Sequence, residues 1–151
     1  MELETLSNET VDKEDLRLLY KENGEITRAY LEWRHKVMSR FFLTTAGILF
    51  IARWMYENDA LRPLIWVPFL LGAIFSFSTA LMDNVNSRIL GGCYKYGEKM
   101  EKLLSSEAGV YGIANHEFTN HPITYSKVLK TVYWGTTILS IIVSYFTYKY
   151  L

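Results

Sequence analysis

Residues 63–82 constrain the fold of this chain more than any other segment. They run for twenty positions without a charged side chain, between Arg62 at one end and Asp83 at the other. A helix of this length crosses the hydrocarbon core of a bilayer, which is about 30 Å thick. The sequence therefore predicts a membrane-spanning helix here, and the other segments are placed by their distance from it.

Two further uncharged runs predict two more spans. Residues 41–52 are uncharged, and the aromatic residues Trp54 and Tyr56 follow them at a predicted interface. Arg53 interrupts this region, either as an interfacial anchor whose long side chain reaches the polar surface or as a pore-mouth or ligand-facing arginine. The last run covers residues 131–148. We expect spans at 41–56, 63–83 and 131–149, with a tight external loop at 57–62.

The segments beside the spans show helical spacing. Residues 1–11 are polar and expected to be mobile, and Asp12 is a predicted N-cap for a cytosolic helix over 12–40. Asn23-Gly24 predicts a break or kink within that helix. A cytosolic helix is predicted over 84–104, followed by a loop and short helix over 105–130. Two heptad-like seams are predicted, which would pair with each other or with neighbouring subunits. The first seam comprises Leu16, Leu19, Asn23, Ile26, Tyr30, Trp33 and Val37, and the second comprises Ile89, Cys93, Tyr96, Met100 and Leu103.

The predicted fold class is an all-α membrane protein with three transmembrane helices and long cytosolic helical extensions, assembled as a homo-oligomer. Residues 1–40 hold seven lysines and arginines and residues 84–130 hold six, whereas the loop between the first two spans holds only Arg62. Because positive charge marks the cytosolic side, the N-terminus is expected in the cytosol and the C-terminus outside. The predicted location is the cell inner membrane.

No catalytic motif is present, and we expect no enzymatic activity. The chain has no Walker loop, no G-x-S-x-G and no H-E-x-x-H. His116, Glu117 and His121 fit no standard metal spacing. We therefore expect neither a cofactor nor a metal. Sixteen basic residues balance sixteen acidic ones, so the net charge does not favour double-stranded nucleic acid.

Hydroxyl-bearing residues within the spans are the first candidate functional set. They recur on one side of the second span up to Asp83 and again on the third span, and they allow two interpretations. They either make hydrogen bonds between helices, or they line a water path in which an acidic ring favours cations. The pore-lining candidates are Ser76, Thr79, Asp83, Thr136, Ser140 and Ser144. A separate small-residue stripe at Gly72, Ser76 and Ala80 predicts close helix packing.

Basic residues interleaved with aromatic ones in the cytosolic segments are the second candidate set. Basic residues beside a span commonly contact anionic lipid. Together with stackable aromatic side chains, they would also suit a nucleotide or oligonucleotide. The ligand-binding candidates are Arg28, Trp33, Arg34, Arg40, Arg88, Lys95 and Lys99.

In layout the chain resembles small membrane effectors of bacterial nucleotide-signalling antiphage systems. These are the SLATT-type proteins, the few-span effectors of CBASS and the channel effector of the Hailong system. The likeness is architectural: LEWRHKV enters a span, a tight hairpin follows, and DNVNSRIL leaves the second span. It implies an oligomeric pore or membrane-disrupting effector that responds to a nucleotide signal.

The leading hypothesis is therefore an oligomeric membrane ion channel in antiphage defence, gated by a cytosolic ligand. The alternative hypothesis is a non-catalytic scaffold, or an auxiliary transporter subunit, that binds a cytosolic partner through its helical seams.

Overall fold

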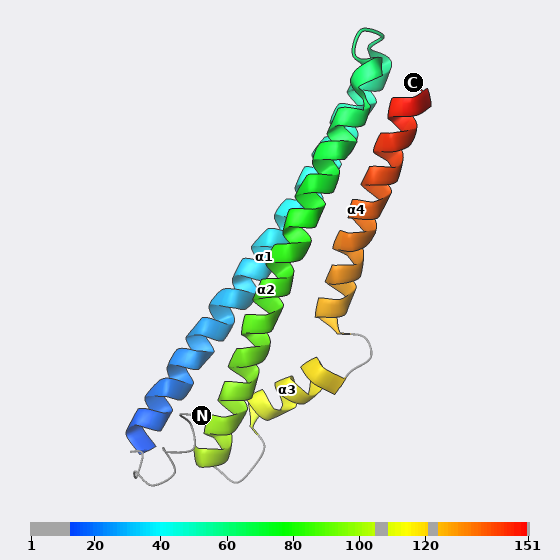
Figure 1. Ribbon diagram of the computed structural model, residues 1–151. Coiled ribbons are helices and arrows are strands. Elements are labelled where there is room, and N and C mark those ends of the chain that lie inside the picture. The colour runs from blue at the N-terminus through cyan, green and yellow to red at the C-terminus, as the bar shows by residue number, and fades with distance from the viewer. Residues whose placement is uncertain (1–12, 105–108, 121–123, 151) are drawn as a thin grey trace. The chain divides into compact units, whose positions relative to one another are not determined.

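The computed structural model describes residues 13–104, 109–120 and 124–150, and this part of the chain contains helices but no strand. The elements are α1 (Lys13–Glu57), the 3-10 helix η2 (Arg62–Leu64), α2 (Trp66–Leu104), α3 (Val110–Asn120) and α4 (Tyr125–Tyr150) (Figure 1). Three helical segments are long and apolar enough to cross a membrane, namely Lys13–Glu57, Arg62–Leu104 and Tyr125–Tyr150. The all-α fold with three membrane-length helices is confirmed. The predictions for residues 1–11 and Asp12, and those for 105–108 and 121–123, lie outside the described residues.

The chain forms two compact units. Unit 1 is built from Met1–Tyr30 and Leu90–His121, and unit 2 from Leu31–Ile89 and Pro122–Leu151. One boundary between the units falls within α1, after Tyr30, and another falls within α2, after Ile89. Each of these two helices therefore contributes to both units. Unit 1 also contains α3, and unit 2 also contains α4.

The predicted helix break at Asn23-Gly24 is wrong, because α1 is continuous from Lys13 to Glu57. Asn23 is buried, and its Nδ2 donates a hydrogen bond to the backbone carbonyl of Cys93 at 3.1 Å. The Thr27 hydroxyl donates to the Asn23 carbonyl at 2.7 Å. Tertiary contact thus fixes a dipeptide that on its own favours a turn.

The interior face of α1 differs from the predicted seam. Leu19, Ile26 and Trp33 are exposed. The buried residues of α1 are Leu16, Asn23, Thr27, Arg34, Phe41 and Ala52, and three of them are polar. The prediction is confirmed at Leu16 and Asn23 but missed Thr27 and Arg34, whose polar side chains are buried because each has a hydrogen-bond partner.

Cys93 and Met100 of the second predicted seam are buried within the chain, and its other positions are left for the predicted alternative, pairing with neighbouring subunits. Ile89, Tyr96 and Leu103 are exposed. The buried face of α2 in unit 1 comprises Leu90, Cys93, Gly97, Met100 and Glu101. The missing side chain of Gly97 makes room for the ring of Tyr111 from α3, and Gly91 faces Phe118 in the same way. Glycines therefore allow the aromatic residues of α3 to lie directly on α2.

The connection between α1 and α2 is a short, hydrogen-bonded turn. The backbone N–H groups of Leu61 and Arg62 donate to the Asn58 carbonyl, each at 2.9 Å. Arg53 and Glu57 form an exposed ion pair of 2.6 Å at the end of α1. Because α2 begins at Trp66, Pro68 lies in its first turn, where proline costs no intrahelical hydrogen bond. A proline inside a helix can kink it, but at this position in the first turn Pro68 gives no reason to expect a kink.

In unit 2, α1 and α2 run side by side from this turn, with α4 alongside (Figure 1). The small-residue stripe of α2 is buried as predicted, with Ser76 and Ala80 at 1 % and 2 % exposure. A Cβ added to Gly72 would lie 3.3 Å from an Ile48 methyl and 3.6 Å from the Ser140 hydroxyl. Gly72 therefore lies where α1, α2 and α4 approach one another.

Candidate functional site

A buried ion pair lies near the end of unit 2 at which α4 begins. The Nε of Arg34 on α1 donates to Oδ1 of Asp83 on α2 at 2.8 Å, and its Nη2 donates to Oδ2 at 3.1 Å. The two side chains are only 4 % and 2 % exposed. This two-point contact matches the planar guanidinium to the carboxylate and is a strong form of ion pair. Arg34 thereby fixes the register of α1 against α2.

The first residues of α4 close the site from a third side. The ring of Tyr125 lies 5.1 Å from the Arg34 guanidinium carbon, in cation–π range. The hydroxyl of Ser126 lies 3.3 Å from that of Ser87, which itself accepts a hydrogen bond from Arg34 Nη2 at 3.3 Å. Three helices thus converge on one buried charge pair.

An apolar layer lies next to the ion pair. It is formed by Phe41, Ala80, Leu129 and Tyr133, all buried. The rings of Phe41 and Tyr133 meet edge to face with centroids 4.7 Å apart. Phe41 is seven residues after Arg34, and Ala80 is three residues before Asp83. The layer therefore separates the charges from the hydroxyls deeper in the predicted spans.

Most of the predicted pore-lining residues point into unit 2. Ser76, Thr79, Asp83 and Ser144 are buried, and Thr136 and Ser140 are partly buried. Thr79 donates to its own helix at the Phe75 carbonyl, and Ser144 donates across to the Trp66 carbonyl at 3.1 Å. In this conformation Asp83 and Ser144 make hydrogen bonds between helices of one subunit, whereas Thr79 and Thr136 bond within their own helices. A water path lined by them requires the helices to separate.

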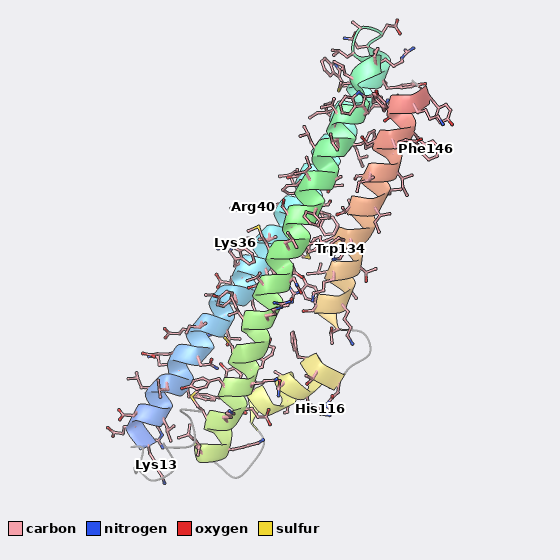
Figure 2. The ribbon with its side chains drawn as sticks, in the orientation of Figure 1. Lys13, Lys36, Arg40, His116, Trp134 and Phe146 are labelled. Atoms are coloured by element: carbon pink, nitrogen blue, oxygen red, sulfur yellow. The ribbon has the colours of Figure 1, made fainter. Side chains whose placement is uncertain are left out.

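The ligand-binding candidates are divided between the two units. Arg28, Lys95 and Lys99 belong to unit 1, and the other four belong to unit 2. All except Arg34 are exposed. Figure 2 shows Arg40 and the neighbouring Lys36 projecting outward from α1. Arg34 is occupied by Asp83, so it is not available to a ligand in this conformation.

Unit 1 contains a second polar centre, at Glu101. Its carboxylate accepts hydrogen bonds from the backbone N–H groups of Tyr111 and Gly112 and from the Tyr20 hydroxyl, each at 2.9 Å. Glu101 thus caps the N-terminus of α3, where a negative charge is favoured. Burial, followed by the hydrogen bond to Glu101 and the charge of Glu101, raises the pKa of Tyr20 to about 12.

A pocket of about 550 Å³ lies beside α3 in unit 1, and its lining includes Glu98, Asn115 and His116. Asn115 Nδ2 and Lys102 Nζ donate to the Glu98 carboxylate at 2.7 and 2.6 Å. The bond from Lys102, followed by that from Asn115, lowers the pKa of Glu98. Within the described residues, no group of three His, Cys, Asp or Glu side chains is arranged to hold a metal ion.

The sequence interpretation missed the roles of Glu101, Asn86 and Tyr133. Asn86 is 2 % exposed and Tyr133 is completely buried. Heptad spacing carried a usable signal, because Asn86 follows Asp83 by three residues and Tyr133 follows Ser126 by seven. For Glu101 no local pattern indicated that it caps a helix nine residues further along the chain.

Comparison with known proteins gave no match: no protein-family model, curated protein or solved structure is similar to this chain.

Proposed function

We propose that the chain is a multi-pass protein of the bacterial inner membrane that assembles as a homo-oligomer and conducts ions. Its cytosolic helices would respond to a soluble ligand such as a nucleotide or oligonucleotide. One observation carries this proposal: the membrane-length helices of unit 2 enclose a polar interior with a buried Arg34–Asp83 pair. A membrane anchor needs only apolar contacts, whereas an ionisable residue buried at the end of a span, as Asp83 is, points to an ion pathway.

The surface of unit 2 supports the membrane setting. Large apolar side chains on all three helices face outward, among them Leu43 and Phe50 at about three-quarters exposure. On α2 and α4, Leu71 and Leu139 are more than half exposed. Apolar surface of this extent is covered by lipid or by other subunits in membrane proteins and is rare in soluble monomers.

Conduction requires a rearrangement of unit 2. Three helices packed around Phe41 and Tyr133 leave no open path, so the conducting state would separate them and place the serine and threonine hydroxyls beside water. Neighbouring copies would complete the wall of the path. Asp83, released from Arg34, would then place a ring of carboxylates at the cytosolic mouth and favour cations.

The decisive experiment is a current recording from purified protein in planar bilayers, under a potassium chloride gradient. The native protein is expected to conduct with a cation preference, and Asp83→Asn is expected to weaken that preference. Glu117→Gln removes an exposed carboxylate from α3 and serves as the control with unchanged selectivity. A tight oligomer that passes no current, with or without nucleotides and short single-stranded oligonucleotides, would refute the proposal. Unchanged selectivity in Asp83→Asn would remove Asp83 from the path.

The role in antiphage defence rests on the resemblance in layout alone. An adjacent gene for a nucleotidyltransferase would support it.

The second candidate function is a non-conducting scaffold or auxiliary transporter subunit. The pocket beside α3, with Glu98 and His116 in its lining, favours it because the pocket offers a docking place outside the predicted spans. A cytosolic protein that co-purifies in fixed stoichiometry, together with normal growth on overexpression, would support this alternative. Loss of the partner in Ile113→Asp, which alters the pocket lining, would assign the docking place.

A further inference from the structure

Two polar side chains in the interior of unit 2 have no hydrogen-bond partner among the described residues. Both amide atoms of Asn86 are buried and unpaired, as is the hydroxyl of Tyr133. The two residues are 2 % and 0 % exposed. Buried polar groups in native proteins are nearly always paired, so each exception has a cause.

Both unpaired groups lie beside the Arg34–Asp83 pair. Arg34 contacts Asp83 and Ser87, and Asn86 belongs to the same turn of α2. The ring of Tyr133 packs on Phe41 in the adjacent layer, together with Ala80, which lies one turn of α2 before Asp83.

The chemistry of the unpaired groups complements the two charges. The Asn86 carbonyl oxygen is an acceptor that suits a guanidinium, and the Tyr133 hydroxyl is a donor that suits a carboxylate. Breaking a buried ion pair normally leaves two uncompensated charges, which is strongly unfavourable. Here each charge has a polar group nearby that no other residue uses.

We propose that the Arg34–Asp83 pair is one of two states of a switch within unit 2. In the second state Arg34 donates to the Asn86 carbonyl oxygen, and Asp83 accepts a hydrogen bond from the Tyr133 hydroxyl. α1 can then shift along α2 at this level without leaving a bare charge in the interior. This switch does not depend on the proposed conduction, since any function that moves α1 against α2 would use it.

Thermal midpoints of purified protein in detergent test the switch through four substitutions. In the native background, Asn86→Leu and Tyr133→Phe are expected to raise the midpoint, because each removes an unpaired buried group. In an Asp83→Asn background Arg34 depends on Asn86, so Asn86→Leu is expected to lower the midpoint. In an Arg34→Gln background Asp83 depends on Tyr133, so Tyr133→Phe is expected to lower it. This reversal of sign is the signature of the switch.

Thr137→Val is the matched control. It also removes one buried hydroxyl from α4, but that hydroxyl already donates to the Tyr133 carbonyl at 2.9 Å. Its effect should have the same sign in every background.

Two outcomes would overturn the proposal. If Asn86→Leu and Tyr133→Phe raise the midpoint in all backgrounds, the two polar groups destabilise the protein and do not serve as alternative partners for Arg34 and Asp83. If the two substitutions lower the midpoint in all backgrounds, the Asn86 amide and the Tyr133 hydroxyl bind water in the state that contains the Arg34–Asp83 pair. Should Asp83→Asn or Arg34→Gln fail to fold, Asp83→Glu and Arg34→Lys provide charged backgrounds with a weakened two-point contact. The same reversal is expected there with a smaller shift, and its absence overturns the switch.

Discussion

At the scale of single residues, Gly97 determines how α3 packs in unit 1. The ring of Tyr111 lies over the Cα of Gly97, where a Cβ would clash with three ring atoms. The same ring meets Tyr20 edge to face with centroids 5.3 Å apart. One missing methyl group therefore allows contacts that join α1, α2 and α3.

Gly97→Ala should destabilise unit 1 by about 1–3 kcal/mol, because an overpacked site must displace a ring or a helix. Gly92→Ala is the matched control, since a Cβ there meets nothing within 4 Å. That control should gain up to about 1 kcal/mol from helix propensity. Denaturant unfolding in detergent compares the two, and similar effects of the two substitutions would contradict the assignment.

The raised pKa of Tyr20 predicts a loss of stability at high pH. The folded protein keeps this phenol protonated to a pKa of about 12, against an ordinary value of 10.0. The contribution to stability is therefore complete below pH 10 and is lost as the pH rises through about 12. Tyr20→Phe should flatten the fall in the thermal midpoint over this range, and substitution of the exposed Tyr96 by Phe should not. A parallel fall in all three proteins would disprove the link.

At the scale of elements, the long helices were predictable and their interior faces were not. The long uncharged runs in the sequence located the apolar parts of α1, α2 and α4. Such runs are easily recognised, because charged residues are rare in segments that cross lipid. The faces were assigned only in part: Leu19 and Ile26 of the predicted seam are exposed, Asn23 of the seam is buried as predicted, and Arg34, outside the seam, is buried as well. The partners of those two polar residues, Cys93 and Asp83, lie 70 and 49 residues away in the sequence, and no local pattern reveals such pairs.

Among the elements, α3 depends most on a single distant side chain. It has only 11 residues, and helices this short are marginal in water without tertiary support. Glu101 of α2 supplies that support at the second and third residues of α3.

Glu101→Gln should therefore loosen α3 by about 1–2 kcal/mol, the usual scale for loss of an N-terminal cap. Hydrogen exchange of the Tyr111 and Gly112 amides is the direct measurement, and both should exchange faster. Glu117→Gln, an exposed change within α3 itself, should leave their protection unchanged. Equal protection in native protein and Glu101→Gln would show that the cap is not needed.

At the scale of the whole molecule, the three membrane-length helices predict an odd number of crossings. The candidate site was only partly predictable at this scale. The sequence singled out Asp83 and the hydroxyl-bearing residues as candidates. It could not predict that they are buried within one subunit, because that depends on how α1, α2 and α4 align with one another.

Reporter fusions measure the number of crossings. Alkaline phosphatase, active only outside the cytosol, should be inactive when fused after residue 104 and active when fused after residue 150. A fluorescent protein that matures only in the cytosol should give the opposite pattern. The same result at both positions would rule out a third crossing.

The sequence distance between Arg34 and Asp83 also gives unit 2 an order of assembly during synthesis. A lone arginine cannot take its buried position, because an unpaired interior charge costs several kcal/mol. Asp83 follows Arg34 by 49 residues, so this part of α1 must stay in a polar setting until α2 supplies its partner. The two charges can be buried only together, when α1 and α2 pair, and α4 completes the site through Ser126 and Tyr125. A nascent chain stopped before residue 83 would be a natural substrate for quality-control proteolysis.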